Sequence, residues 1–240
     1  MKVLGIIPSR YQSSRFPGKP LVDIAGKSMI QRVYEQAIKS SMITDVIVAT
    51  DDQRIFDHVQ EFGGKVEMTS ADHKNGTERC GEIISKYSDA DIVINIQGDE
   101  PLINPSQLDK VISLFTNDDV SIGTLAKKIS DKSVIENPNR VKVVMDKNSD
   151  ALYFSRSVIP HKLKDTNVDY YKHIGIYAWR LNTLKDLLDL APTQLEQIES
   201  LEQLRWMENG YRLRVAETTV ETPNIDTPED LDEVLKLLNR

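Results

Sequence analysis

One short segment, residues 92–96, limits the folds open to this chain more than any other. It reads Ile92-Val93-Ile94-Asn95-Ile96, so an extended strand there would be β-branched and apolar on both faces. Strands of this kind are typical of parallel sheets that helices cover on both sides. The apolar runs at residues 3–7 and 46–49 are too short for helices and fit the same sheet, and residues 66–69 suggest a further strand.

Segments with helical spacing lie between the predicted strands. Residues 29–38 repeat apolar side chains at helical intervals, and a later helical stretch ends at Gly63-Gly64. Asn104 can cap a helix that starts at Pro105 and carries an apolar stripe, and residues 227–230 resemble a capping box before the last helix. The alternation predicts an α/β fold with one doubly wound, mostly parallel sheet.

The length of the chain fits one or two domains. It has 240 residues, against a prior of about 150 residues per domain, and it contains no internal repeat, low-complexity tract or obvious linker. Between residues 141 and 179 the sequence is richer in β-prone residues and has no clear helix until Leu181. We therefore expect a single domain, residues 1–240, with an inserted, partly antiparallel lobe at about residues 141–180.

Charge and composition restrict the partners. The chain has 30 Lys and Arg against 37 Asp and Glu, and this acidic balance disfavours broad nucleic-acid binding. Its one cysteine, Cys80, excludes an internal disulfide and a cysteine-based zinc site, and favours a reducing compartment. No apolar run approaches the length of a membrane span or a signal-peptide core. We expect a soluble, cytoplasmic protein with no nucleic-acid partner and no membrane span.

Three cations follow the first predicted strand, where open α/β sheets bind their ligands. Arg10, Arg15 and Lys19 lie within residues 8–20, between hydroxyl groups and a glycine. Arginine makes forked contacts and lysine supplies a mobile charge, so the loop suits a polyphosphate. Its glycine spacing matches neither a Walker A loop nor a dinucleotide fingerprint. A solvated basic loop would have the same composition.

Carboxylates follow the strongest predicted strand and precede the last helix. Asp99 and Glu100 stand in the segment Gln97-Gly98-Asp99-Glu100-Pro101, where Gly98 allows a ligand to approach the backbone. Such oxygen ligands suit Mg²⁺, which takes one or two carboxylates together with phosphate oxygens. The alternative for Asp99 and for Asp226 is helix capping, and Asp226 becomes a candidate ligand only beside Asp99.

A further candidate segment is Asn75-Gly76-Thr77-Glu78-Arg79. It fits a tight turn into a helix that Thr77 would cap. Arg79 would then lie in the first helical turn, where a cation opposes the helix dipole, so an anionic ligand is worth considering.

These segments belong to a series of motifs that runs in order along nearly the whole chain. The motifs are Ile7-Pro8-Ser9-Arg10-Tyr11, Ser14-Arg15-Phe16-Pro17-Gly18-Lys19-Pro20-Leu21, Ala49-Thr50-Asp51-Asp52, Met68-Thr69, Gly76-Thr77-Glu78-Arg79, Asn95-Ile96-Gln97-Gly98-Asp99-Glu100-Pro101-Leu102, Tyr153-Phe154-Ser155-Arg156, Ile159-Pro160, His173-Ile174-Gly175-Ile176-Tyr177, Leu201-Glu202-Gln203-Leu204-Arg205 and Asp226-Thr227-Pro228-Glu229-Asp230-Leu231. The complete series resembles the cytidylyltransferases of 3-deoxy-manno-octulosonate (Kdo).

The resemblance implies a Rossmann-like nucleotide-diphospho-sugar transferase fold and a reaction. CMP would pass from CTP to the anomeric hydroxyl of Kdo with release of pyrophosphate, for lipopolysaccharide assembly. It also implies Mg²⁺ as cofactor and a homodimer. In-line positioning and charge neutralisation would supply most of the catalysis, and no histidine is needed as a base.

The resemblance also implies roles for individual residues. The expected catalytic residues are Lys19, Arg15, Asp99 and Asp226, of which the two aspartates would be the magnesium ligands. The nucleotide would contact Pro8, Ser9, Arg10, Lys19, Asn75 and Gln97. Kdo would contact Arg79, Gln97, Arg156, His173, Tyr177, Glu202 and Gln203.

The sequence departs from the family pattern at two positions. Glu78 stands where Asp is common, and Asn75 stands where Ser is usual, which affects the base and sugar contacts. Glu100 favours ordinary Kdo over its 8-amino analogue. Three alternatives stay open from the sequence: a transferase for that analogue or for a sugar 1-phosphate, a nucleotide sensor without turnover, and a non-enzymatic adaptor.

Overall fold

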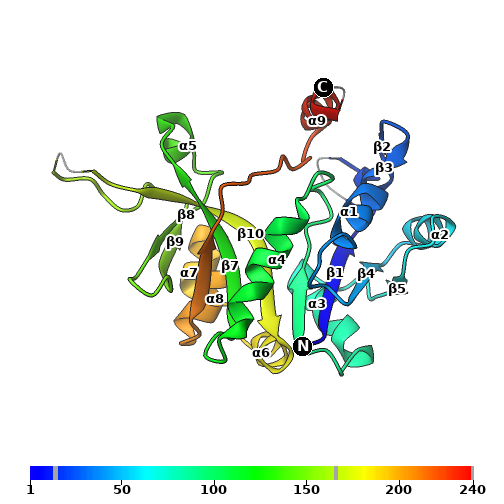
Figure 1. Cartoon of the computed structure of the whole chain (residues 1–240), viewed down its shortest axis with the longest axis horizontal. Helices are drawn as coiled ribbons and strands as arrows, with labels where there is room; N and C mark the ends of the chain where they lie inside the picture. Colours follow the sequence, from blue (N-terminus) through cyan, green and yellow to red (C-terminus); the bar gives the residue numbers. More distant parts are fainter. Residues whose placement is uncertain (13–15, 165–166, 239–240) are drawn as a thin grey trace. The chain divides into compact units, whose positions relative to one another are not determined.

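The computed structural model describes residues 1–12, 16–164 and 167–238 (Figure 1). They form two compact units. Unit 1 comprises residues 1–109 and 222–240, and unit 2 comprises residues 110–221. Among the helices of these described ranges, none has the length and apolarity needed to cross a membrane.

Unit 1 contains four parallel strands in the order β6-β1-β4-β5. They are β1 (Val3–Ser9), β4 (Asp45–Thr50), β5 (Val66–Met68) and β6 (Ile92–Asn95), so the four predicted strands are confirmed. The side chains of Ile92, Val93 and Ile94 have no exposed surface, as a strand covered on both faces requires. The predicted α/β class with a mostly parallel sheet is thus confirmed.

A helix follows each of these four strands. The helices are α1 (Met29–Ala37), α2 (Gln53–Glu61), α3 (Gly76–Lys86) and α4 (Pro105–Ser113), of which the last crosses the boundary between the units. As predicted, the Asn104 side chain caps α4 by accepting a hydrogen bond from the Ser106 amide at 2.9 Å. The prediction that Thr77 caps α3 is wrong. The cap is Asn75, whose extended backbone lets its Oδ1 accept from the Glu78 amide at 2.8 Å.

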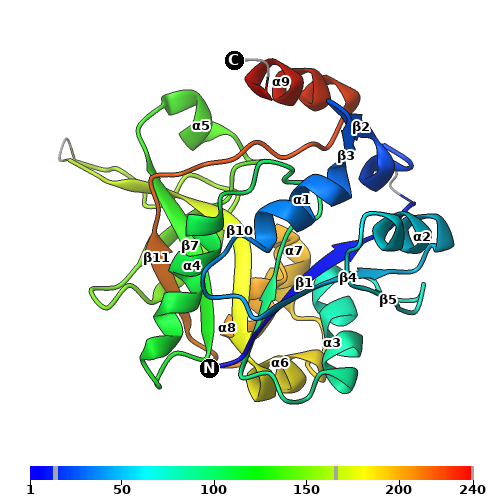
Figure 2. The same cartoon turned by 45° about the vertical axis from the view of Figure 1, so that its right-hand side comes forward.

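The last part of the chain returns to unit 1. There α9 (Pro228–Leu238) packs against the hairpin of β2 (Asp23–Ile24) and β3 (Lys27–Ser28) through a buried cluster, and Figure 2 shows this helix beside the hairpin. The cluster consists of Ile24, Met29, Ile225 and Val234. One of the two hydrogen bonds of the predicted capping box is present, because the Asp230 carboxylate accepts from the Thr227 amide at 2.8 Å.

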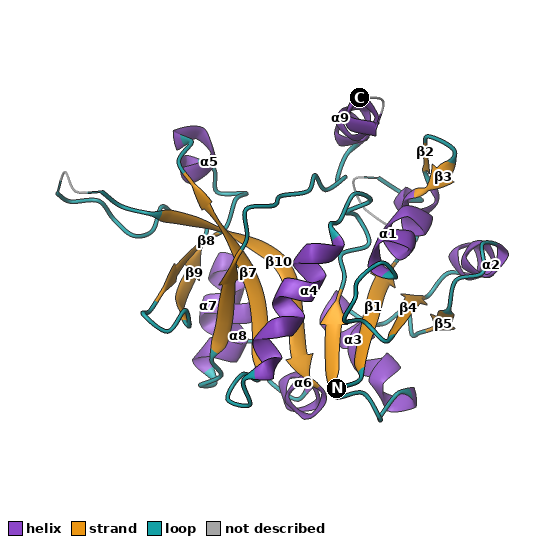
Figure 3. Ribbon diagram, viewed as in Figure 1, coloured by secondary structure: helices purple, strands orange, loops and turns teal. Residues whose placement is uncertain are grey.

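Unit 2 is built around strands of mixed direction (Figure 3). The strand β7 (Ile122–Ile129) pairs in parallel with β11 (Leu213–Glu217) and antiparallel with β10 (Tyr170–Arg180). The latter also pairs with β8 (Lys142–Met145), which continues to β9 (Ala151–Ser155). The shorter elements are η2 (Leu114–Thr116), α5 (Lys132–Glu136), α6 (Leu181–Leu188), α7 (Gln194–Glu199) and α8 (Gln203–Glu208).

The β-prone segment that ends at residue 179 therefore contains antiparallel strands, and the first clear helix after it begins at Leu181, as predicted. The organisation as a single domain with a lobe at residues 141–180 stays a prediction.

Candidate active site

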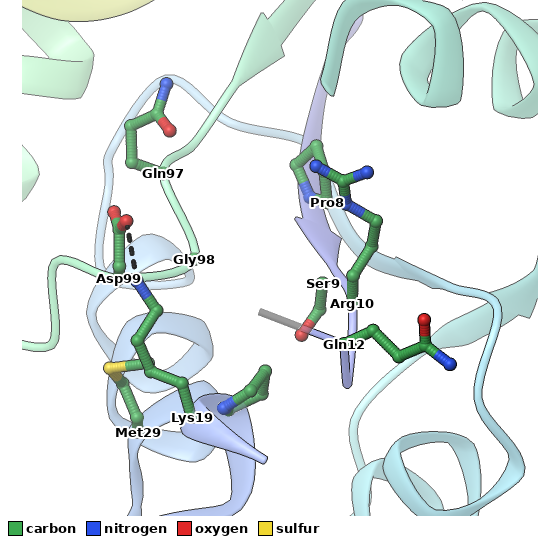
Figure 4. A pocket seen from close by; sticks show the side chains of 10 residues that line it. Pro8, Ser9, Arg10, Gln12, Lys19, Met29, Gln97, Gly98 and Asp99 are labelled. Atoms are coloured by element: carbon green, nitrogen blue, oxygen red, sulfur yellow. Dashed lines mark hydrogen bonds and ion pairs between the residues drawn. The ribbon is translucent and has the colours of Figure 1, made fainter. Parts of the chain in front are cut away.

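A cavity opens at the carboxyl ends of β1 and β6, which are neighbours in the parallel sheet of unit 1. Its volume is about 310 Å³, and Figure 4 shows the side chains around it. The lining residues are Pro8, Ser9, Arg10, Gln12, Lys19, Pro20, Met29, Gln97, Gly98 and Asp99. Five of them, Pro8, Ser9, Arg10, Lys19 and Gln97, are predicted nucleotide contacts, so the fold brings these five together.

The loop after β6 approaches the end of β1 closely. A Cβ atom on Gly98 would lie 2.8 Å from the Pro8 carbonyl oxygen, so a larger residue would push the two backbones apart. The glycine thus has a packing reason in addition to the predicted approach of a ligand. Next to it, the hydroxyl of Ser9 is buried and has no hydrogen-bond partner within the described chain. Buried polar groups are normally paired, so this hydroxyl suits a polar ligand in the cavity.

Lys19 connects the two predicted metal ligands. It begins the short helix η1 (Lys19–Leu21), directly after Gly18, which has a φ of +73°. Its Nζ lies 3.1 Å from Asp99 Oδ2 and 3.5 Å from Asp226 Oδ1, and it donates to the Ile225 carbonyl at 2.7 Å. Figure 4 shows the Lys19 side chain directed at Asp99.

These positions fit a divalent cation. The Lys19 ammonium is itself a cation that two carboxylates share, so both aspartates can face one positive charge. Their oxygens are the hard donors that Mg²⁺ prefers. Within the described ranges, no three His, Cys, Asp or Glu side chains group so that they could hold a metal by themselves. The site therefore suits an ion that takes its other ligands from phosphate and water.

Arg79 has its charge partner inside unit 1. Its side chain is only 1% exposed, and Nη2 lies 2.9 Å from Asp51 Oδ2, while Nη1 donates to the Thr69 hydroxyl. Asp51 follows β4 and Thr69 follows β5, so the guanidinium ties two strand ends to α3. The position of Arg79 in the first helical turn suggested an anionic partner, and the Asp51 carboxylate is that partner.

For two other predicted site residues of unit 1, Asn75 and Arg15, the predicted role stays a prediction. The Asn75 side-chain oxygen accepts from the Glu78 amide in the cap of α3, and its Nδ2 lies 3.5 Å from Glu78 Oε1, so a contact with the base stays a prediction. Arg15 lies outside the described residues.

In unit 2, His173 and Tyr177 stand on β10 within a group of aromatic rings. The His173 ring lies 4.9 Å from Phe154 and 5.3 Å from Tyr177, measured between centroids. Burial, with a smaller effect from the Lys172 ammonium, lowers the pKa of His173 to about 3. The ring is therefore neutral at pH 7. Because the Thr124 hydroxyl donates to the Ile176 carbonyl at 2.8 Å, it accepts from His173 Nε2 at 2.9 Å, which leaves Nδ1 as an acceptor.

The half-buried His173 ring makes stability depend on pH in a measurable way. Between pH 6.5 and 3 the unfolded chain binds a proton at His173 that the folded chain does not, so the free energy of unfolding falls as pH falls through this window. The slope from this group is at most about 1.4 kcal/mol per pH unit. His173→Gln, which keeps a donor and cannot titrate, should flatten the slope in urea unfolding experiments. An unchanged slope would contradict the assignment.

Two further predicted sugar contacts have unsatisfied polar atoms. The Tyr177 hydroxyl and the Gln203 Nε2 are buried without a hydrogen-bond partner in the described structure. Burial, and to a lesser extent the Glu202 carboxylate, raises the pKa of the Tyr177 hydroxyl, so it stays protonated and can donate. Hydroxyl, amide and carboxylate groups of this kind suit a polyhydroxylated ligand.

Arg156, in contrast, makes structural contacts. Its guanidinium donates to the carbonyl oxygens of Glu199 at 2.7 Å, Pro138 at 3.1 Å and Ser200 at 3.3 Å. It thereby joins the end of β9 to α7 and to the loop before β8. A contact with Kdo at this residue stays a prediction.

The comparison with known proteins decides the family. A family model described as cytidylyltransferase matches residues 4–219. A 3-deoxy-manno-octulosonate cytidylyltransferase of Bacteroides thetaiotaomicron is 53% identical over 241 residues, which cover 96% of each chain. The chain belongs to the 3-deoxy-manno-octulosonate cytidylyltransferase family. A member from Geobacter metallireducens is 48% identical and covers 100% of this chain and 99% of its own.

Solved structures agree with the family. A CMP:2-keto-3-deoxy-manno-octonic acid synthetase complexed with CTP has a TM-score of 0.96 and 45% identity, over 100% of this chain and 99% of that one. A putative glucose-1-phosphate thymidylyltransferase from Bacillus anthracis, 17% identical with a TM-score of 0.68, shares the fold. Membership in the cytidylyltransferase family makes this protein an enzyme, a nucleotidyltransferase, as the sequence predicted.

Sequence reasoning missed three contributors to the candidate site. The Ile225 carbonyl, which accepts from Lys19, has no sequence signal because every residue has a carbonyl. Gln12 and Met29 line the cavity, and neither belongs to a motif with chemistry of its own.

Proposed function

We propose that this protein transfers CMP from CTP to Kdo and releases pyrophosphate. The single observation that carries the proposal is the group of Lys19, Asp99 and Asp226 at the cavity beside Pro8 and Ser9. Lysine and two carboxylates at one point suit a triphosphate with a bound metal. The full-length similarity to the Kdo cytidylyltransferases supports CTP and Kdo as the substrates.

Each group of residues has a part in the proposed reaction. Arg10 and Lys19 bind the phosphates, and Lys19 stabilises the charge that collects on pyrophosphate as it leaves. Asp99 and Asp226 would hold Mg²⁺, which would neutralise phosphate charge at this position. The buried Ser9 hydroxyl and the backbone of Pro8 bind the nucleoside.

The acceptor contacts form the second part of the proposal. The Tyr177 hydroxyl, Gln203 Nε2 and the Nδ1 acceptor of His173 bind hydroxyl groups of Kdo, with Glu202 beside Tyr177. In-line placement of the anomeric hydroxyl against the α-phosphorus then provides most of the rate. By resemblance to the family, we extend the proposal to a cytoplasmic homodimer whose product serves lipopolysaccharide assembly.

The direct test is pyrophosphate release by the purified protein with Mg²⁺. CTP together with Kdo should give pyrophosphate and CMP-Kdo, and omission of either substrate should stop both. A panel of acceptors should include the 8-amino analogue and a hexose 1-phosphate. Faster turnover with one of these would reassign the acceptor, and binding of CTP without any turnover would make the protein a sensor.

Nucleotide choice gives a second prediction. CTP should be used at least about a hundredfold better than UTP, as judged by kcat/KM with Kdo, because a site that hydrogen-bonds a polar edge leaves buried groups unpaired with the wrong base. Initial rates of pyrophosphate release with CTP, UTP, ATP and GTP measure this. Equal turnover with UTP would show that the base edge is not read.

A further inference from the structure

Asn224 contacts one of the proposed metal ligands directly. Its side-chain Nδ2 donates to Asp226 Oδ2 at 3.0 Å, from a position two residues earlier in the chain. Both side chains are half-buried. Neither the helix cap that follows nor the buried cluster around Ile225 accounts for this amide.

The backbone on both sides of Asn224 and Asp226 is fixed by other groups. The Ile225 amide donates to the Asp99 carbonyl at 2.9 Å, and the Ile225 side chain has no exposed surface. The Asp226 amide donates to the Asp230 carboxylate at 2.8 Å. These contacts fix the position of the Asp226 backbone. The rotation of its carboxylate is set by side-chain partners.

The two oxygens of Asp226 face different partners. Oδ2 accepts from Asn224, and Oδ1 lies 3.5 Å from Lys19 Nζ, the ammonium that also contacts Asp99. An amide donor suits the first position because it holds an oxygen without adding a charge beside Asp99 and Asp226. A carboxylate there would repel them, and an alanine would remove the hydrogen bond to Oδ2.

We propose that Asn224 is a positioning residue that turns Oδ1 of Asp226 toward the cation position beside Asp99. This inference rests on the proposed function, in which Asp226 holds the metal. Partners that orient a metal ligand change metal affinity or activity by about 10- to 100-fold when they are removed. Asn224 should act on the metal first and on turnover only as a consequence.

The experiment measures metal binding as well as activity. The affinity for Mn²⁺ in the presence of CTP, read from the electron paramagnetic resonance signal of free Mn²⁺, should fall about 10- to 100-fold in Asn224→Ala. Turnover should fall at low Mg²⁺ and recover in large part as Mg²⁺ is raised, while the KM for Kdo changes little. Thermal unfolding should keep its midpoint within a few degrees.

A matched control is available on α2. Gln53 Nε2 donates to Asp57 Oδ1 at 2.6 Å, which is the same amide–carboxylate pair on an exposed helix, so Gln53→Ala should leave Mn²⁺ affinity unchanged. Native Mn²⁺ affinity in Asn224→Ala would overturn the positioning role while the proposed function stands. Native Mn²⁺ affinity and turnover in Asp226→Asn would overturn the metal role of Asp226 and this inference with it.

Discussion

Asp99→Asn and Asp226→Asn should each lower turnover with CTP and Kdo by at least about a hundredfold, which is the effect of losing one electrostatic stabiliser in a transition state. Asparagine keeps the shape of the side chain and removes the charge that both carboxylates direct at the same point, where Lys19 Nζ lies 3.1 and 3.5 Å away. The double variant should lose much less than the product of the two single effects, because the two groups act as one unit.

Initial rates over a range of Mg²⁺ concentrations test this prediction. Circular dichroism should show that both variants fold, since Asn has nearly the shape of Asp and the Asp230 carboxylate, which holds the start of α9, is unchanged. Asp57→Asn, which changes an exposed aspartate on α2, is the matched control and should keep native turnover. A variant at Asp99 or Asp226 with near-native rates at limiting Mg²⁺ would remove that residue from the site.

Arg79→Ala should lower the free energy of unfolding by about 3 to 5 kcal/mol, because breaking a buried ion pair leaves the other charge without its partner. The guanidinium is 1% exposed and the Asp51 carboxyl group 16% exposed, so water replaces the lost contact poorly. Asp51→Ala alone should also destabilise the protein. The double variant should be less unstable than the two single effects add up to, because it leaves no isolated buried charge.

Urea unfolding of the native protein and the three variants gives this cycle. Additive losses would mean that the two side chains do not interact. The cycle also separates two roles of Arg79, because the predicted contact with Kdo would raise the KM for Kdo in a variant that is still folded at the assay temperature. A change in stability with an unchanged KM would leave Arg79 a purely structural residue.

The sequence predicts the strands of unit 1 well for a simple physical reason. A short apolar run such as Ile92 to Ile94 is buried on both faces. In an α/β protein such a run forms a central strand of a parallel sheet that helices cover on both sides. No strand is predicted at β7 or β11, because the two pair with each other across a long stretch of chain and a short β-prone run does not reveal such a partner. The Asn75 cap was missed because Asn-Gly also signals a turn.

For the candidate site, the sequence reveals the charged residues better than it reveals their partners. Charged side chains such as Lys19 and Asp99 can be recognised from their motifs, and the fold brings them together as expected. What the sequence hides is how each charge is partnered. The sequence around Arg79 favours an external anion, whereas the structure gives its guanidinium the Asp51 carboxylate as partner. The sequence around Asn224 gives no sign of its hydrogen bond to Asp226.

The contact of the Ile225 amide with the Asp99 carbonyl also has a consequence during protein synthesis. Asp99 leaves the ribosome more than a hundred residues before Asp226, and the parallel strands of unit 1 are all translated before that point. A nascent chain can therefore form this sheet and still lack one of the two carboxylates beside Lys19. A chain that terminates after β6 and before residue 226 would contain all four parallel strands of unit 1 and lack Asp226, so under our proposal it would not bind the metal or consume CTP.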